Sequence, residues 1–76
     1  MPADQPQWIL DARRAVGLRV RDARVWRDMT QEELAHEAGI DRSSVQRIEL
    51  GQNDPRLTHL LRIASALHVH VRDLLG

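Results

Sequence analysis

The segment from Thr30 to Gly51 constrains the fold of this chain more than any other part of the sequence. It carries start and stop signals for two short helices that follow each other closely. Thr30 and Glu33 have the spacing of a capping box, in which each side chain satisfies a backbone N–H at the start of a helix. Gly39 ends that helix, because the left-handed conformation at a helix end is least costly without a Cβ. Asp41 is a suitable N-cap for the second helix.

The apolar residues of this segment fall on one side of each expected helix. Leu34, Ala35 and Ala38 share a face of the first helix, and Val45 and Ile48 share a face of the second. Two short amphipathic helices joined by a tight turn form the helix-turn-helix layout. The sequence therefore predicts a helix-turn-helix over residues 30–51.

The opposite face of the second expected helix is rich in hydrogen-bond donors, which are Arg42, Ser43, Gln46 and Arg47. Side chains of these types can bond to base edges in the major groove of DNA. Polarity alone is weak support, since any exposed helix face is polar. The combination of a short helix, a Gly-Ile turn, a second short helix and a donor-rich face is what favours DNA binding.

This segment resembles the DNA-binding domain of the lambda-repressor/Cro-like (Xre-type) family. The motifs that carry the resemblance are Thr30–Ala35, Gly39-Ile40, Ser44-Val45 and Ile48–Gly51. Residues 17–24 are similar to the family's first helix and residues 60–69 to its fourth, so the resemblance covers roughly residues 15–75. It implies an all-α fold, a compact five-helix bundle with one helix-turn-helix.

The resemblance also implies roles for individual residues. Arg42, Ser43 and Arg47 would read bases, with Gln46 at the edge of that surface. The residues expected to contact DNA phosphates are Gln31, Arg24, Gln52 and Asn53. The positions of Arg24 and Glu49 form an ion pair in similar domains, which would hold the end of the reading helix and aim Arg24 towards a phosphate.

A long first helix is predicted before the helix-turn-helix. Pro6 suits its first position, and a core-facing stripe follows at Ile9, Ala12, Val16, Val20 and Ala23. Gly17 costs this helix about 1 kcal/mol relative to Ala, so it marks a close crossing of another helix or a kink. Trp8 and Trp26 are expected to cap the core rather than to stack on a ligand. Residues 1–14 extend the first helix beyond the usual family boundary.

A fourth and a fifth helix are predicted after it. Asp54 is the expected N-cap of the fourth, with Pro55 at its first position. Its expected apolar stripe is Leu57, Leu60, Leu61, Ala64 and Leu67. A short helix over residues 71–75 ends the chain. The family usually has Gly or Asn where His68 stands.

One such domain reads too few bases for high specificity, so a homodimer on paired half-sites of double-stranded DNA is the expected solution. The 76 residues leave room for a single domain, 1–76, and for no separate oligomerisation domain. The dimer interface should therefore come from the apolar residues at the end of the bundle, which are Val69, Val71, Leu74 and Leu75.

Charge is neutral overall but uneven along the chain. Eleven arginines balance eleven acidic residues, whereas DNA-binding domains are often basic. Residues 13–27 hold six of the arginines and a single aspartate. Because non-specific DNA affinity depends on phosphate neutralisation, we expect that affinity to be weak.

Several function classes find no support in the sequence. There is no cysteine, and the spacing of His59, His68 and His70 matches no standard zinc pattern, so neither a metal nor another cofactor is expected. Ser43 and Ser44 have no positioned His–acid pair, so an enzyme is not expected. No segment is long enough to span a bilayer and no signal peptide is evident, which favours a cytoplasmic location.

The sequence thus predicts a sequence-specific transcriptional regulator, and it is equally compatible with a repressor and an activator. One alternative is an antitoxin-type interaction module that neutralises a partner protein. Another is the controller protein of a restriction-modification system, which is similarly short.

Overall fold

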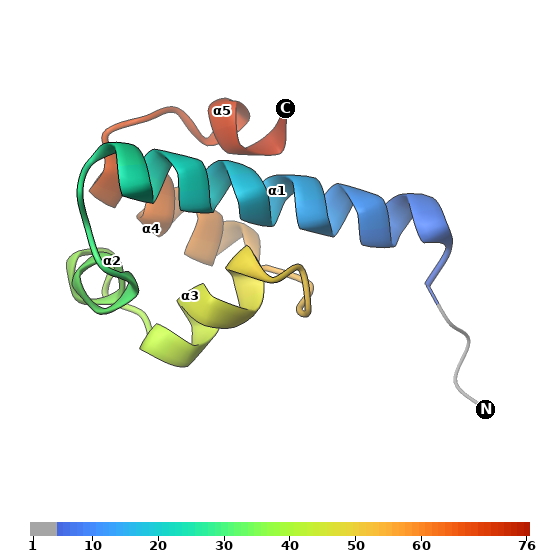
Figure 1. Ribbon diagram of the computed structural model, residues 1–76, viewed down its shortest axis with the longest axis horizontal. Helices are drawn as coiled ribbons and strands as arrows, with labels where there is room; N and C mark the ends of the chain where they lie inside the picture. The colour runs from blue at the N-terminus through green and yellow to red at the C-terminus, as the bar shows by residue number, and fades with distance from the viewer. Residues whose placement is uncertain (1–4) are drawn as a thin grey trace.

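Five α-helices make up most of the computed structural model, which describes residues 5–76 (Figure 1). Their bounds are α1 Gln7–Trp26, α2 Gln31–Ala38, α3 Arg42–Glu49, α4 Leu57–Leu67 and α5 Val71–Leu75. No strand occurs within residues 5–76. The predicted fold class, an all-α five-helix bundle with a helix-turn-helix, is confirmed.

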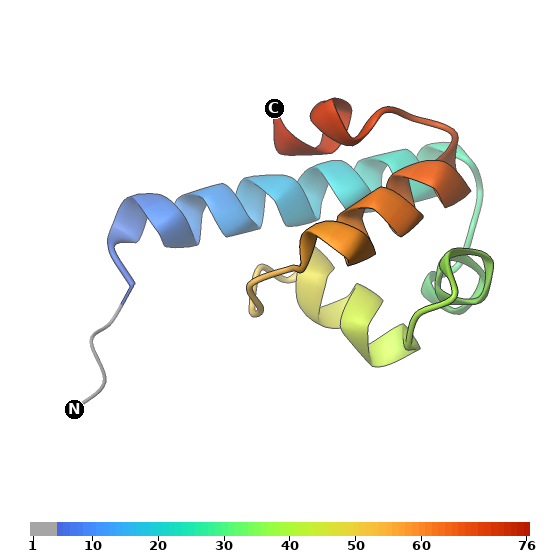
Figure 2. The same cartoon turned by 180° about the vertical axis from the view of Figure 1, so that it is seen from behind.

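Helix α1 spans the whole length of the molecule, and the other helices gather around its C-terminal two-thirds (Figures 1 and 2). Helix α5 lies along one side of α1, whereas α2 and α3 lie on the opposite side. The N-terminal turns of α1 project beyond the bundle. This projection gives the molecule its elongated shape, with principal extents of 39 × 23 × 19 Å.

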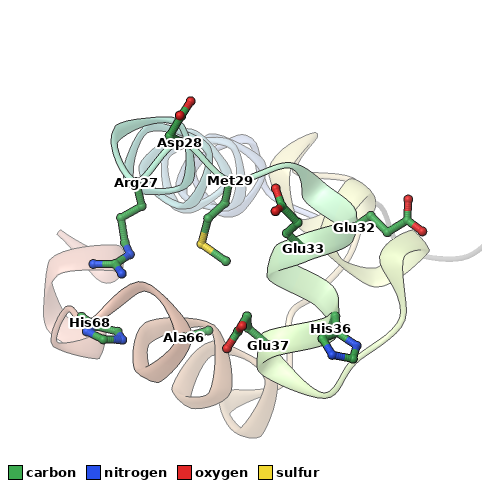
Figure 3. Close-up of a pocket in the computed structure, with 9 residues that line it drawn as sticks. All are labelled: Arg27, Asp28, Met29, Glu32, Glu33, His36, Glu37, Ala66 and His68. Carbon is green, nitrogen blue, oxygen red and sulfur yellow. The ribbon is translucent and has the colours of Figure 1, made fainter.

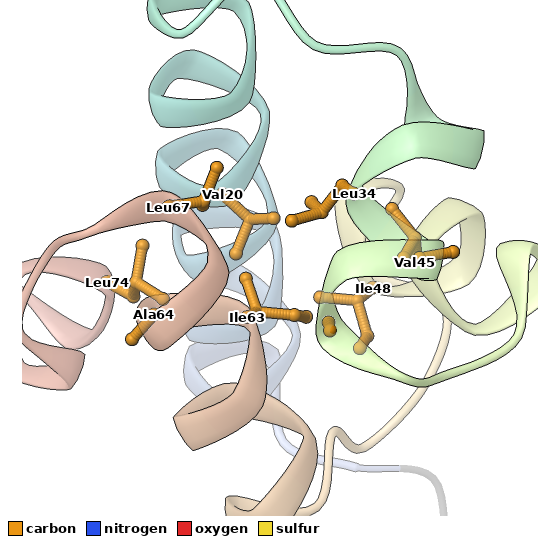
Figure 4. Packing of buried hydrophobic residues seen from close by; sticks show 10 residues of the cluster. Val20, Leu34, Val45, Ile48, Ile63, Ala64, Leu67 and Leu74 are labelled. Carbon is orange, nitrogen blue, oxygen red and sulfur yellow. The ribbon is translucent and has the colours of Figure 1, made fainter.

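Every helix contributes at least one side chain to a single hydrophobic core (Figure 4). The largest fully buried side chains are Leu34, Ile63, Leu67, Leu74, Val20 and Val45. Burying a side chain of this kind stabilises the folded state by at least about 1.5 kcal/mol. A short helix such as α3, which is marginal in isolation, therefore depends on this core.

The capping box at the start of α2 and the glycine at its end form as predicted. The Thr30 hydroxyl accepts a 3.0 Å hydrogen bond from the Glu33 N–H, and the Glu33 carboxylate accepts one of 2.8 Å from the Thr30 N–H. The bond from the Thr30 backbone lowers the pKa of Glu33. Gly39 closes the helix with φ 68°. Asp41 is the N-cap residue of α3 as predicted, but its side chain makes no capping hydrogen bond.

Gly17 marks a close helix crossing, the first of the two predicted alternatives. A Cβ at this position would lie 2.6 Å from the Glu49 carbonyl oxygen and closer still to that of Ile48. Both atoms belong to the backbone of α3 and cannot rotate away. The absence of a side chain at Gly17 therefore allows α3 to pack directly on α1.

Replacing Gly17 with Ala tests this contact. Helix propensity alone predicts stabilisation by about 1 kcal/mol. We expect destabilisation by about 2 kcal/mol or more instead, because the backbone of α3 must move away from the new methyl group. Urea unfolding followed by circular dichroism measures the difference. Leu18→Ala, at an exposed neighbouring position, should change stability little, and equal effects of the two variants would contradict the close crossing.

Both long helices begin slightly later than predicted. Pro6 is the N-cap of α1 rather than its first residue. Helix α4 begins at Leu57 with Arg56 at the N-cap, so the prediction that Asp54 caps it and Pro55 opens it was wrong. The Asp54 carboxylate instead lies 3.9 Å from the Arg13 guanidinium, across the gap to α1.

The buried face of α4 is also rotated from the predicted one. Leu60, Ala64 and Leu67 are buried as expected, but Ile63 joins them. Leu57 and Leu61 are 62% and 48% exposed. The rotation arises because α4 packs extensively against α2, and the side of α4 that carries Ile63 is buried.

The ends of α1 differ from the prediction for a similar reason. Trp8 and Trp26 are 71% and 89% exposed, so neither caps the core. Ala12, placed in the core stripe by its spacing, is exposed as well. Trp8 belongs to the projecting turns of α1, and Trp26 is the last residue of that helix.

Most of the residues expected to form a dimer interface pack against their own core. Leu74 is only 1% exposed, and Val69 and Val71 are partly buried against the same cluster. Leu74 therefore serves the protein's own core, and Val69 and Val71 do so in part. Leu75, at 51% exposure, is the member of the set that stays open to a partner.

His68 takes the position where the family usually has Gly or Asn, and it adopts the conformation that favours those residues. It ends α4 with φ 59° and ψ 40°, in the left-handed region. That conformation costs a residue with a Cβ about 1–2 kcal/mol. The boundary between α4 and α5 therefore carries a local strain that the rest of the fold offsets.

We expect His68→Gly to stabilise the protein by about 1 kcal/mol, because glycine adopts this conformation without the Cβ penalty. For a chain of this size, the melting temperature should rise by about 4–8 °C. Ser65→Gly, at an exposed position within α4, is the matched control and should lower it. A lower melting temperature for His68→Gly would contradict the assignment of strain.

Candidate nucleic-acid interface

The donor-rich face predicted for the second helix of the helix-turn-helix is the outer face of α3. Its exposed side chains are Arg42, Ser43, Gln46 and Arg47. On the other side of the helix, Val45, Ile48 and Glu49 are buried. The helix thus separates a packed side from a solvent-facing side that carries two guanidinium groups, an amide and a hydroxyl.

A bidentate ion pair fixes the C-terminal end of α3 to α1. The Arg24 Nε donates to Glu49 Oε2 over 2.7 Å, and the Arg24 Nη2 donates to Glu49 Oε1 over 3.0 Å. The two side chains are 14% and 3% exposed. The hydrogen bonds with Glu49 raise the pKa of Arg24. Two parallel bonds define the relative orientation of the two groups as well as their distance.

The same carboxylate also holds the start of α2. The Gln31 side-chain amide donates to Glu49 Oε1 over 3.0 Å. Residues from three helices therefore meet at one buried carboxylate, which lies directly behind the exposed face of α3. This third contact was not predicted, because the family resemblance assigned Gln31 only a phosphate contact.

Arg24 was expected both to pair with Glu49 and to contact a phosphate, and the structure confirms the pair. Its Nη1 also donates to the Met29 carbonyl oxygen over 2.8 Å. Its side chain is 14% exposed and lines a shallow hollow between the starts of α2 and α3. Its geometry is that of a positioning residue for α3.

The other expected phosphate-contacting residues lie around α3. Gln31 opens α2, and Gln52 and Asn53 are exposed in the loop that follows Gly51. The shallow hollow between the starts of α2 and α3 is lined by Arg24, Thr30, Gln31, Glu32 and Arg42. It has two guanidinium groups against one carboxylate, and the unpaired N–H groups at a helix start attract anions, so the hollow suits a phosphate better than a cation.

A second hollow, between the end of α1, α2 and the end of α4, has a different character (Figure 3). Its charged and histidine side chains are Arg27, Asp28, Glu32, Glu33, His36, Glu37 and His68. The carboxylates outnumber the cations, so this surface does not favour a nucleic acid. Within residues 5–76, no three side chains of the metal-binding types lie close enough to hold an ion.

A family model described as helix-turn-helix matches residues 20–74 of this chain. The chain belongs to the lambda-repressor/Cro-like helix-turn-helix family. An HTH-type transcriptional regulator of Archaeoglobus fulgidus is 36% identical over 56 residues, which cover 74% of this chain and 80% of that protein. The immunity repressor protein of Bacillus phage phi105 is 36% identical over 61 residues, which cover 80% of this chain and 42% of the repressor.

Solved structures of this family have the same fold. The restriction-modification controller protein C.AhdI from Aeromonas hydrophila has a TM-score of 0.80 at 37% identity, covering 82% of this chain and 94% of that protein. The hypothetical transcription factor NHTF from Neisseria has a TM-score of 0.83 at 33% identity, covering 100% of this chain and 86% of that protein.

The family is one of helix-turn-helix transcriptional regulators, which are DNA-binding proteins and not a class of enzymes. No helix within residues 5–76 combines the length and apolar character that crossing a membrane requires.

The ion pair behind α3 can be tested by replacing Glu49 with Gln. The amide cannot accept from Arg24 and Gln31 as the carboxylate does, and it leaves the Arg24 charge without a partner. We expect a loss of about 2–4 kcal/mol in the free energy of unfolding, measured by urea titration. The control is Glu32→Gln at an exposed position nearby, for which the change should stay within about 0.5 kcal/mol. Equal unfolding midpoints for both variants would contradict a positioning role.

Proposed function

We propose that this protein binds double-stranded DNA sequence-specifically, as a homodimer on paired operator half-sites, with α3 in the major groove. The observation that carries the proposal is the exposed donor face of α3, held from behind by the pair of Arg24 and Glu49. Because its orientation is fixed before DNA arrives, little ordering cost remains to be met on binding.

Base reading is proposed for Arg42, Ser43 and Arg47, with Gln46 at the edge of the surface. A guanidinium matches the two acceptors on the major-groove edge of guanine, so at least one arginine should read a G in each half-site. Ser43 and Arg47 are four residues apart and therefore lie one above the other along α3. The face is thus long enough to reach more than one base pair.

Phosphate contacts are proposed for Gln31, Arg24, Gln52 and Asn53, which lie around the two ends of α3. Such contacts set the register of the helix on the duplex without reading sequence. Only Arg24 among them is charged, its charge is paired with Glu49, and the chain has no net charge. Binding should therefore depend on base contacts more than on non-specific attraction, which scales with the number of phosphates neutralised.

A homodimer is proposed because one α3 face offers only four candidate reading side chains. Two copies related by a two-fold axis read two half-sites, usually one helical turn of DNA apart, and so multiply the specificity. Regulation of transcription then follows from occupying such a site near a promoter.

The reading role of α3 can be tested after the operator has been selected from random DNA. Arg42→Ala or Arg47→Ala should cost about 1–3 kcal/mol on the preferred site and relax the preference at one base pair, because a bidentate base contact is lost. Fluorescence anisotropy on operators with single base changes measures both effects.

The control is Arg21→Ala, which removes an exposed arginine of α1. It should change affinity about equally on all sequences, and it should reduce the salt dependence by about one unit of slope if Arg21 touches a phosphate. If the Arg42 and Arg47 variants keep the wild-type base preferences, α3 is not the reading helix.

A more specific candidate is the controller protein of a restriction-modification system. It is favoured by the similarity to C.AhdI, which extends over 94% of that protein, close to its whole length. This candidate predicts that the selected operator occurs upstream of the protein's own gene and beside restriction and methylation genes. An operator found only at unrelated genes would exclude it.

A further inference from the structure

An apolar groove lies where the projecting end of α1 passes the loop before α4 and the end of α5. Its apolar walls are formed by Trp8, Ile9, Ala12, Pro55, Leu60 and Leu75. Most of the surface that lines it is apolar, whereas the hollow of Figure 3 is mainly polar. The groove is therefore suited to an apolar side chain.

The edge of this groove exposes large side chains that the bundle does not use. Trp8 is 71% exposed, because α1 continues past the point where other helices cover it, and Leu75 is 51% exposed. Leu57 and Leu61 are also exposed, on the first two turns of α4, the helix that contributes Leu60 to the groove. An exposed apolar surface of this kind commonly marks a protein contact.

We infer that this groove is the contact between two copies of the chain, with the Trp8 of each copy seated in the groove of the other. This inference rests on the homodimer of the proposed function and names the surface that forms it.

The form of the surface favours a second copy over a different protein. Trp8 forms one wall of the groove and, at 71% exposure, is also accessible to a second copy. In a two-fold contact the same patch faces itself, so a projection on one copy meets the groove of the other twice. A second copy of the same chain is therefore sufficient to fill both grooves.

The charged residues at the rim of the groove can also pair between two copies. Arg13 lines the groove, and its Nε is buried without a hydrogen-bond partner. Its only ion pair within residues 5–76 is the loose 3.9 Å contact with Asp54, whose side chain is 84% exposed. Two such rims related by a two-fold axis bring a cation of each copy towards a carboxylate of the other, where a closer pair can form.

The contact should be weak in free protein. A buried Trp contributes about 150–250 Å². The contact would bury two reciprocal tryptophans, the surfaces that receive them and the neighbouring leucines. Its total buried area should be close to the lower limit of about 1,200 Å² for stable interfaces. We expect a dimer dissociation constant between about 1 µM and 1 mM, and tighter pairing when both copies are held on one operator.

Sedimentation equilibrium of the full chain tests the contact. Trp8→Ala should raise the dimer dissociation constant about tenfold or more, because central tryptophans dominate such interfaces. Trp26→Ala is the matched control, since it removes the other exposed tryptophan of α1 at the far end of the helix. It should change the constant less than about twofold. Circular dichroism checks that both variants keep their helicity.

Disulfide trapping adds a second measurement that keeps Trp8 in place. The chain contains no cysteine, so single substitutions define the only thiols. A mixture of Gln7→Cys and Leu75→Cys proteins should form the mixed disulfide under mild oxidation. A mixture of Arg27→Cys and Leu75→Cys proteins, with the first thiol beside Trp26, should not.

The outcomes separate this inference from the proposed function. A dimer that Trp8→Ala leaves unchanged, together with no mixed disulfide from Gln7→Cys, overturns the groove contact while the homodimer stands. A chain that stays monomeric up to about 1 mM and binds its selected operator as one copy overturns both. Weakening by Trp8→Ala alone, with trapping through Gln7→Cys, supports the reciprocal contact.

Discussion

The carboxylate of Glu49 is the point on which the arrangement of this molecule depends. It is almost fully buried, and it accepts hydrogen bonds from Arg24 of α1 and Gln31 of α2 while belonging to α3. A buried charge is costly unless its partners are well placed, so the three helices can meet there in few relative positions. The orientation of the exposed face of α3 follows from a contact that faces away from any ligand.

Gly17 complements this electrostatic contact with a steric one. The missing side chain allows the backbone of α3 to approach α1 at the level of Ile48 and Glu49, next to the ion pair. Helix α3 has eight residues and would be marginal alone. Its contacts with α1 thus add to the shared core in stabilising and orienting it, which explains how so short a helix can present side chains in a defined direction.

Features set by neighbouring residues could be read from the sequence, and features set by distant contacts could not. The capping box of Thr30 and Glu33 and the closure at Gly39 depend only on local spacing, and both were predicted correctly. The exposure of Leu57 and of Trp8 depends on which helix lies opposite, which periodicity does not specify. Likewise, the family resemblance predicted the pair of Arg24 and Glu49, but only the structure showed that Arg24 also donates to the Met29 carbonyl oxygen. The burial of Leu74 against its own core is a further contact that a terminal apolar cluster does not reveal.

The continuity of α1 has a geometric consequence for the spacing of half-sites in the operator of the proposed dimer. One unbroken helix connects the groove at Trp8 with the ion pair at Arg24, and sixteen residues of helix correspond to about 24 Å. In the proposed dimer, a helix of this kind would fix the distance between the contact of the two copies and the place where each α3 is anchored. Inserting one residue into it would lengthen that distance by about 1.5 Å and rotate the end of the helix by about 100°. The proposal therefore implies that the spacing between half-sites is set by the length and phase of α1 rather than by a flexible linker.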